Sequence, residues 1–370
     1  MSSTAFPIEE IIERFHLSGN YKDYCTIETG HINNTYLLTF EQDGVLIKRI
    51  LQKINVSVFK NPDQLMHNII SVTDYLKDKI TQNGGNPSRE TLDFYKTNDG
   101  KYYYQDEQGS HWRCYVYVDD VYSCNSIENP EVFFNAGAAF GTFQEQLSGF
   151  PSGELYETIP NFHNTRVRFA ALKTAIDENL AGRRETVRDE IEFALSRERD
   201  ASVVVELLES GEIPPRVTHN DTKLNNVLFD KNTNKAICVI DLDTIMPGSS
   251  LYDFGDAIRF GANTAKEDEK DLSKVSLDLG LYEQYVKGYL STAGAALTQQ
   301  EIALLPFSAK LMTYECGMRF LTDYLNGDTY FRIAYPEHNL DRCRTQFELV
   351  RDIERNYDEM MRITMQAAKK

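Results

Sequence analysis

Apolar positions follow strand-like spacing in the first third of the chain and helical spacing in the rest. Runs rich in β-branched and aromatic residues predict strands over residues 24–28, 35–40, 45–54, 102–104 and 112–118. Helical spacing predicts helices over 7–15, 61–80, 130–147, 166–208, 281–290 and 299–325. We therefore expect a sheet-rich N-terminal lobe over residues 1–118 and a mainly helical C-terminal lobe over 119–370, with the hinge after Val118.

The segment 217–256 carries the candidate chemistry. Asn226 follows Asp221 by five residues, and an apolar run then leads to Asp241 and Asp243. Phosphoryl transfer needs an oxygen that orients the attacking hydroxyl, and amide and carboxylate oxygens that hold Mg²⁺. We interpret Asp221 as that base, Asn226 and Asp241 as metal ligands, and Asp243 as a ligand of a second metal or of a bound water. The alternative is that these side chains cap turns or lie solvated at a strand end.

Four longer motifs carry a resemblance to a known family. They are T-H-N-D-T-K-L-N-N, I-D-L-D-T-I-M-P-G, D-F-G-D-A-I-R-F-G-A and E-C-G-M-R-F-L. They resemble the aminoglycoside phosphotransferase and choline kinase superfamily, and more narrowly the bacterial N-acetylhexosamine 1-kinases, from about residue 30 to about residue 346. The resemblance implies a two-lobed α+β, protein-kinase-like fold. It also implies ATP- and Mg²⁺-dependent phosphorylation of the anomeric hydroxyl of N-acetylglucosamine or N-acetylgalactosamine.

The segment 217–256 contains three more residues with an expected role near Asp221, namely His219, Lys223 and Asp253. Lys223, close behind Asp221, is expected to neutralise charge on the transferred phosphoryl group, with a surface lysine as the alternative. His219 is expected to be structural. Asp253 begins the triplet D-F-G, but Asp241 already ends the metal-bearing strand, so we expect Asp253 to be buried and to accept hydrogen bonds from catalytic-loop amides. No A-P-E follows, which argues against a protein kinase.

Nucleotide contacts are expected in the N-terminal lobe. The backbone at Gly30 and the side chains of His31 and Asn33 lie in a turn that would cover the phosphates, although an ordinary hairpin turn has the same composition. Backbone groups near Tyr117 and Val118 are expected to meet the adenine.

The phosphate-binding lysine of the kinase pattern is harder to place. Gln52 stands about where it is expected, with Lys48 and Lys53 nearby, and the strand register is open. The following helix has no acid between Asp63 and Asp74, which leaves the usual lysine–glutamate pair in doubt.

The resemblance also implies an acceptor site in the C-terminal lobe. Arg319 is expected to bind sugar oxygens or the acetamide carbonyl, Tyr330 to offer a hydroxyl and an apolar face, and Asp221 to contact the reacting hydroxyl. A solvated, salt-bridged helix face is the alternative for the column that Glu315, Arg319 and Asp323 form. His163 is expected to be structural.

Composition limits the partners. The 370-residue chain has a formal charge of −17, which argues against nucleic acid and anionic membranes as partners. It shows no signal peptide, no apolar run long enough to span a membrane and no paired cysteine motif, so we expect a cytoplasmic protein. Two alternative functions stay open, a superfamily kinase for another small alcohol and a nucleotide-binding pseudokinase module. Oligomeric state is left open.

Overall fold

The chain folds into two compact units. A computed structural model describes residues 7–27, 32–127 and 129–369. Unit 1 contains the chain up to Val121 together with two later segments, 153–160 and 240–243. Unit 2 contains residues 122–152, 161–239 and 244 onward. The sequence did not predict that two later segments pack with the N-terminal part.

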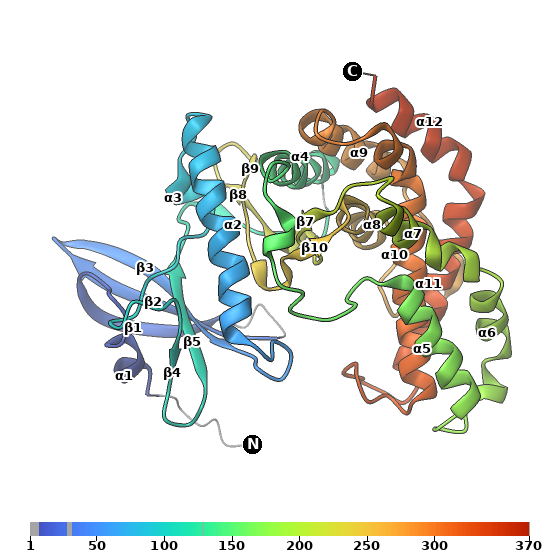
Figure 1. Ribbon diagram of the computed structural model, residues 1–370, viewed down its shortest axis with the longest axis horizontal. Coiled ribbons are helices and arrows are strands. Elements are labelled where there is room, and N and C mark those ends of the chain that lie inside the picture. The colour runs from blue at the N-terminus through green and yellow to red at the C-terminus, as the bar shows by residue number, and fades with distance from the viewer. Residues whose placement is uncertain (1–6, 28–31, 128, 370) are drawn as a thin grey trace. The chain divides into compact units, whose positions relative to one another are not determined.

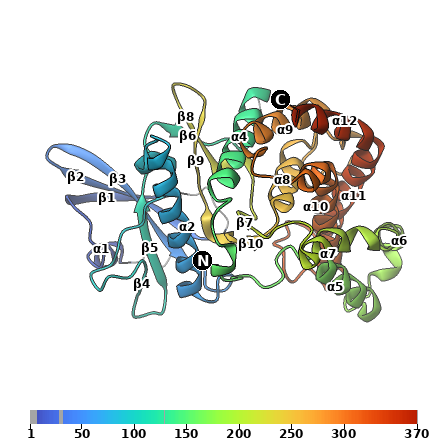
Figure 2. The same ribbon diagram turned by 45° about the horizontal axis from the view of Figure 1, so that its top comes forward.

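Unit 1 is built on an antiparallel sheet of five strands in the order β1-β2-β3-β5-β4. The strands are β1 (Asn20–Ile27), β2 (Asn34–Gln42), β3 (Val45–Ile54), β4 (Tyr104–Gln105) and β5 (His111–Val116). Helix α1 (Ile8–Ile12) packs on one face, over the fully buried Leu51 and Trp112. Helix α2 (Pro62–Gln82) lies beside the sheet (Figures 1 and 2), and the short α3 (Pro87–Glu90) follows it.

Helices make up most of unit 2 (Figure 1). They are α4 (Pro130–Gln146), α5 (Thr165–Glu178), α6 (Arg188–Leu195), α7 (Val203–Ser210), α8 (Ser250–Gly261), α9 (Leu279–Ala293), α10 (Gln299–Leu325), α11 (His338–Arg355) and α12 (Tyr357–Ala367). The long α10 packs against α8 and α11, and it begins with a capping box between Thr298 and Glu301. Phe254 on α8 and Tyr285 on α9 lie in the shared core. None of the helices in the described ranges is long and apolar enough to span a bilayer.

Helices α4 and α9 approach each other closely because glycines remove side chains at their contact. A Cβ on Gly288 would lie 2.0 Å from the carbonyl oxygen of Phe134, and one on Gly137 would lie 2.5 Å from that of Tyr285. Real Cβ atoms do not tolerate such distances, so only glycine permits this packing.

Short strands in unit 2 carry the core segment. β7 (Arg216–Thr218) pairs with β10 (Met246–Gly248), and β8 (Val227–Asp230) pairs with β9 (Ala236–Val239). The strand β6 (Val121–Tyr122) adds to the second sheet, in the order β6-β8-β9. The loop that leaves β7 passes through one turn of 3₁₀ helix, Leu224–Asn226, and enters β8. Both ends of this loop are therefore anchored in sheets.

Candidate active site

The loop between β7 and β8 brings three sequence-predicted residues together. The Oδ1 atom of Asp221 lies 2.7 Å from the Nζ atom of Lys223. The Nδ2 atom of Asn226 donates to the backbone oxygen of Asp221 at 2.8 Å and to its Oδ2 atom at 3.1 Å. Asn226 is buried, whereas the side chain of Asp221 is 26% exposed, so its carboxylate is fixed and still reachable.

Asp253 on α8 fixes the start of this loop. Its Oδ1 atom accepts from the amide of Asn220 at 2.7 Å, and its Oδ2 atom accepts from the amide of His219 at 2.9 Å and from Gln144 at 3.0 Å. Asn220 has a φ of 63°, a left-handed conformation that asparagine tolerates better than most residues. Burial raises the pKa of Asp253, against the effect of His219 and these amide bonds. The interpretation of Asp253 is confirmed, and its triplet lies inside α8 (Ser250–Gly261).

His219 is a packed residue, as expected. It is fully buried, and its ring meets those of Phe140 and Phe143 edge-on, with centroids 5.6 and 6.1 Å away. Its Nδ1 atom accepts a hydrogen bond from the amide of Asp221 at 3.3 Å, so it ties the loop to α4.

Lys223 lies between two acids. Burial lowers the pKa of Lys223, but the charge and hydrogen bond of Asp221 and the charge of Asp256 outweigh it, and the net pKa is raised. Asp256 in turn pairs with Arg259, Oδ1 to Nη2, at 2.8 Å. Lys223 is therefore a permanent cation beside the carboxylate of Asp221 at neutral pH.

The predicted metal ligands are oxygen donors of the right kind. Asn226 uses its Nδ2 atom for Asp221, and no described residue donates to its Oδ1 atom. Asp241 is exposed and has a φ of 59°. No group of three or more His, Cys, Asp and Glu side chains in the described ranges has the arrangement of a metal site. The amide oxygen of Asn226 and the carboxylate of Asp241 are ligands of the kind that Mg²⁺ takes, and Mg²⁺ needs few protein oxygens because phosphates and water complete its shell. Convergence of Asp221 and Asn226 with Asp241, which belongs to unit 1, stays a prediction.

Within unit 1, a polar cluster surrounds Asp243. The Nη2 atom of Arg113 lies 2.5 Å from its Oδ1 atom, and Asn33 donates to its Oδ2 atom at 2.7 Å. Gln52 accepts from the Nε and Nη2 atoms of Arg113 at 3.0 and 2.5 Å. The strand ends at Val239 and residues 242–244 form a 3₁₀ turn, so strand alternation does not relate the directions of Asp241 and Asp243. Its role as a metal ligand stays a prediction, and protein groups already engage both of its oxygens.

The register of β3 separates the candidate lysines. Gln52 and Lys48 share one face of the strand, and Lys53 lies on the other, over the ring of Trp112. Lys48 lies 3.9 Å from the carboxylate of Asp119 and over the ring of Tyr117.

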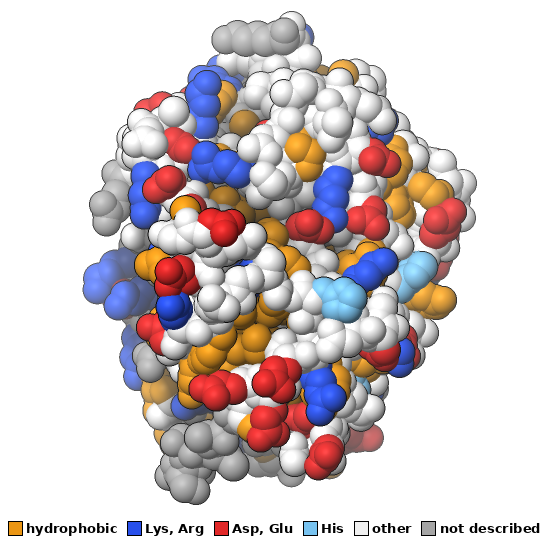
Figure 3. All heavy atoms as spheres, turned by 90° about the vertical axis from the view of Figure 1, so that its left-hand side faces the viewer, with side chains coloured by type: hydrophobic (Ala, Val, Ile, Leu, Met, Phe, Trp, Pro, Cys, Tyr) orange, Lys and Arg blue, Asp and Glu red, His pale blue; other side chains and the backbone are white. Residues whose placement is uncertain are grey.

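The other predicted nucleotide contacts in unit 1 stay predictions. Tyr117 and the buried Val118 directly follow β5, so the strand ends two residues earlier than the predicted 112–118. Gly30 and His31 lie outside the described residues. Acidic and basic side chains are interspersed on the face drawn in Figure 3.

Arg319 on α10 lies among aromatic rings. Its guanidinium carbon is 5.7, 5.8 and 5.5 Å from the ring centres of Phe162, Tyr330 and Phe331. No carboxylate in the described part of the chain pairs with it. Burial and the nearby charge of Arg319 lower the pKa of Arg168. The structure thus brings Arg319 and Tyr330 together and leaves the guanidinium available to a ligand.

The acids of the charged column are buried, so the column is not a solvated face. Glu315 Oε1 lies 2.8 Å from the Nδ1 atom of His163. The Oε2 atom of Glu315 and the Nε2 atom of His163 are buried and have no hydrogen-bond partner among the described residues. Asp323 binds the backbone of the turn that carries Tyr330.

Comparison with known proteins agrees with this geometry. The model of the phosphotransferase enzyme family matches residues 23–272. The chain belongs to this family. The matched region includes β3 and the whole core segment through Asp256, and it ends before Arg319 and Tyr330.

Solved structures of related kinases share the fold of this phosphotransferase. An aminoglycoside phosphotransferase from Alicyclobacillus acidocaldarius is 12% identical over 100% of this chain and 98% of its own, with a TM-score of 0.59. A spectinomycin phosphotransferase, solved with ADP and spectinomycin, is 13% identical over 98% of both chains, with a TM-score of 0.54. A Plasmodium vivax ethanolamine kinase is 14% identical over 88% of this chain and 82% of its own, also at 0.54. The expected aminoglycoside phosphotransferase-like fold is confirmed.

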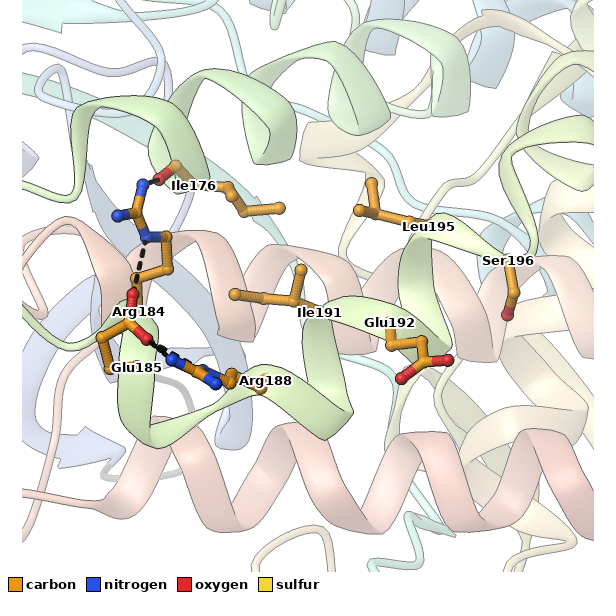
Figure 4. A pocket seen from close by; sticks show the side chains of 8 residues that line it. All are labelled: Ile176, Arg184, Glu185, Arg188, Ile191, Glu192, Leu195 and Ser196. Atoms are coloured by element: carbon orange, nitrogen blue, oxygen red, sulfur yellow. Dashed lines mark hydrogen bonds and ion pairs between the residues drawn. The ribbon is translucent and has the colours of Figure 1, made fainter.

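A separate groove of about 560 Å³ lies between α5 and α6 of the phosphotransferase. Figure 4 shows that Arg184 and Arg188, which line it, both contact Glu185. None of the sequence-predicted site residues lines this groove. Both of its arginines already contact a carboxylate, whereas no described carboxylate pairs with Arg319.

Sequence reasoning missed Arg113 as a site residue. The sequence did contain an indication. Arg113 lies inside the apolar strand run W-R-C-Y-V, and a charged side chain that is buried there must find a partner of opposite charge. The identity of that partner, Asp243, depends on a contact between residues 130 positions apart (243 − 113), which strand periodicity does not predict.

Proposed function

We propose that this phosphotransferase uses ATP and Mg²⁺ to phosphorylate the anomeric hydroxyl of an N-acetylhexosamine, N-acetylglucosamine or N-acetylgalactosamine. The observation that carries the transfer step is the fixed group of Asp221, Lys223 and Asn226 on an anchored loop. Such a group supplies a proton-orienting carboxylate, a cation and a metal-binding amide oxygen together.

The transfer follows from these positions. Asp221 orients the acceptor hydroxyl and accepts its proton as the hydroxyl oxygen attacks the γ-phosphorus. The bond from that phosphorus to the β–γ bridging oxygen breaks, and ADP leaves. Lys223 stabilises negative charge on the phosphoryl oxygens in this step. Asn226 and Asp241 would hold Mg²⁺, which neutralises the ATP phosphates and orients them.

The surroundings of Arg319 support a neutral polar acceptor. Arg319 offers a rigid donor fork that suits a carbonyl oxygen such as that of an acetamide, and the nearby rings suit the apolar face of a sugar. The Oε2 atom of Glu315 and the Nε2 atom of His163 are unpartnered but buried, so they would have to become exposed before they could bind sugar hydroxyls. An aminoglycoside or ethanolamine would bring its own cation toward Arg319, which is unfavourable.

An acceptor panel tests the proposal. ATP consumption is measured with N-acetylglucosamine, N-acetylgalactosamine, glucose, galactose, choline, ethanolamine and spectinomycin, and ³¹P NMR identifies the product. We expect turnover with an N-acetylhexosamine and a product phosphorylated at the anomeric oxygen. Faster turnover with choline, ethanolamine or spectinomycin would replace the proposed acceptor, and ATP binding without turnover of any acceptor would favour a pseudokinase.

A further inference from the structure

Strand β3 has no lysine at the position where the kinase pattern expects one, although Lys48 lies on the same face. Gln52 stands at that position. Two of the three acids of helix α2 are engaged elsewhere, since Asp63 accepts a hydrogen bond from Tyr103 and Asp74 pairs with Lys77. A polar cluster on the same face of the sheet nevertheless contains both a cation and an acid.

The strand register builds this cluster. Gln52 pairs with Thr35 on β2 and with Arg113 on β5, so the three side chains form one row across the sheet. Gln52 donates to the Oγ1 atom of Thr35 at 3.0 Å and accepts from Arg113. These contacts fix which way round the side-chain amide of Gln52 lies, with its nitrogen toward Thr35 and its oxygen toward Arg113. The amide oxygen therefore orients the guanidinium of Arg113.

Arg113 is buried together with its acid. The side chains of Arg113 and Asp243 are 3% and 4% exposed, and their charged atoms lie 2.5 Å apart. Asn33, in the turn that is expected to cover the phosphates, donates to the other oxygen of Asp243. Its own Oδ1 atom accepts from the amide of Asn55 at 2.9 Å. The cluster thus connects β2, β3, β5 and the segment after β9.

We propose that Arg113 is a positioning residue for nucleotide binding, which holds Asp243 and the segment 240–243 in the place where a β3 lysine was expected to act. This inference rests on the proposed ATP-dependent function and concerns the nucleotide half of it. In this proposal, Arg113 takes the part of the strand lysine in the lysine–glutamate pair of the kinase pattern. Asp243 takes the part of the glutamate that kinases carry on the helix equivalent to α2.

Two physical effects link Arg113 to the nucleotide. Without the guanidinium, Asp243 is a buried carboxylate without its cation, so the segment that also carries Asp241 loses its geometry. The unit also gains one net negative charge in a chain of formal charge −17, which repels a polyphosphate. Both effects weaken nucleotide binding and leave the acceptor residues of unit 2 unchanged.

The test measures binding of Mg²⁺-ADP by calorimetry, with KM values for ATP and for acceptor. Arg113→Gln should raise the Kd for Mg²⁺-ADP by about 30-fold or more, as expected for loss of one partner of a buried charge pair. It should raise KM for ATP but not KM for the acceptor. Asp243→Asn should give the same pattern. Lys22→Met, which removes an exposed lysine of β1 that pairs with Glu41, is the matched control and should change neither value. Lys48→Met tests whether the lysine on the same face of β3 anchors the phosphates instead.

A second variant separates positioning from folding. The double variant Arg113→Gln with Gln52→Lys puts a cation back on the neighbouring strand, and we expect it to recover much of the lost affinity. The inference is overturned if folded Arg113→Gln binds Mg²⁺-ADP like the wild type, if Lys48→Met carries the loss instead, or if the double variant recovers thermal stability but no affinity. A wild-type protein that does not bind Mg²⁺-ADP would overturn the proposed function itself.

Discussion

The carboxylate of Asp253 binds the amide of Asn220 at 2.7 Å, one residue before the proposed catalytic base. The same carboxylate holds the amide of His219 and the side chain of Gln144. The position of Asp221 therefore depends on Asp253 of helix α8 as well as on the conformation of its own loop.

Replacing Asp253 with asparagine should therefore impair turnover more than folding. The amide has one acceptor oxygen for three donors, and its NH₂ group faces an N–H, so at least one buried donor is left unsatisfied at about 1–3 kcal/mol. A displacement of the loop by about 1 Å costs roughly 100-fold in rate. We expect kcat to fall about that much, and calorimetry should show retained binding of Mg²⁺-ADP.

The matched control is Asp230→Asn, since Asp230 also accepts from backbone amides, but in the exposed turn after β8. It should lower the melting temperature slightly and leave kcat unchanged. Equal losses of kcat in both variants would contradict a specific role of Asp253.

Variants of Asp221 and Lys223 should lower kcat and leave the Kd for Mg²⁺-ADP nearly unchanged. Asp221→Asn removes the proton acceptor and keeps the shape of the side chain, so kcat should fall by about 10²–10⁴ with little change in the Kd for Mg²⁺-ADP. Lys223→Met removes the cation beside Asp221 and should also lower kcat, whereas Lys231→Met, in the exposed turn before β9, should not. Single-turnover kinetics and calorimetry measure the two quantities. Unchanged single-turnover rates for Asp221→Asn would remove its assignment.

The buried ion pair between Glu301 and Arg216 should make the free energy of unfolding depend on pH. Its two oxygens bind the Nε and Nη2 atoms of Arg216 at 2.5 and 2.7 Å, and its side chain is fully buried. Burial raises the pKa of Glu301, but Arg216 and the amide of Thr298 outweigh it and hold the pKa below its ordinary value of 4.5. The stabilisation is therefore present above about pH 4.5 and is lost as the pH falls through the folded-state pKa.

Glu301→Gln should reveal this linkage. At pH 7 the variant leaves Arg216 buried without its acid, and the free energy of unfolding should fall by about 3–5 kcal/mol. As the pH falls below about 4.5 and through the folded-state pKa, the wild type progressively loses the same stabilisation, so the difference between the two proteins should narrow. Urea unfolding of both proteins at several pH values measures it. A difference independent of pH would show that the ion pair is not its source.

Local patterns predicted much of this fold. The strand over 45–54 and the helix over 299–325 have the predicted bounds, since each has a strong period and clear ends. Asp253 was placed correctly because Asp241 already ended the metal-bearing strand, which left a structural role for the later acid. Arg113, the partners of Glu315 and the packing of residues 153–160 and 240–243 with unit 1 were not predicted, because each depends on contacts between distant parts of the chain.

Asp323 should set the affinity for the acceptor through the turn that carries Tyr330. Its Oδ1 atom accepts from the amides of Thr329 and Tyr330 at 2.9 and 2.8 Å, and its Oδ2 atom accepts from Phe331 at 2.9 Å and Asn339 at 2.8 Å. Because Tyr330 is 68% exposed, little else holds it beside Arg319.

Asp323→Asn should therefore raise KM for the acceptor by about 10-fold, which corresponds to about 1.4 kcal/mol, and leave KM for ATP unchanged. Asp358→Asn on the exposed surface of α12 is the control and should change neither constant. Steady-state kinetics with each substrate varied in turn separates the two KM values. A lower melting temperature with an unchanged acceptor KM would mean that Asp323 only stabilises the fold, because a turn that positions Tyr330 cannot loosen without weakening acceptor binding.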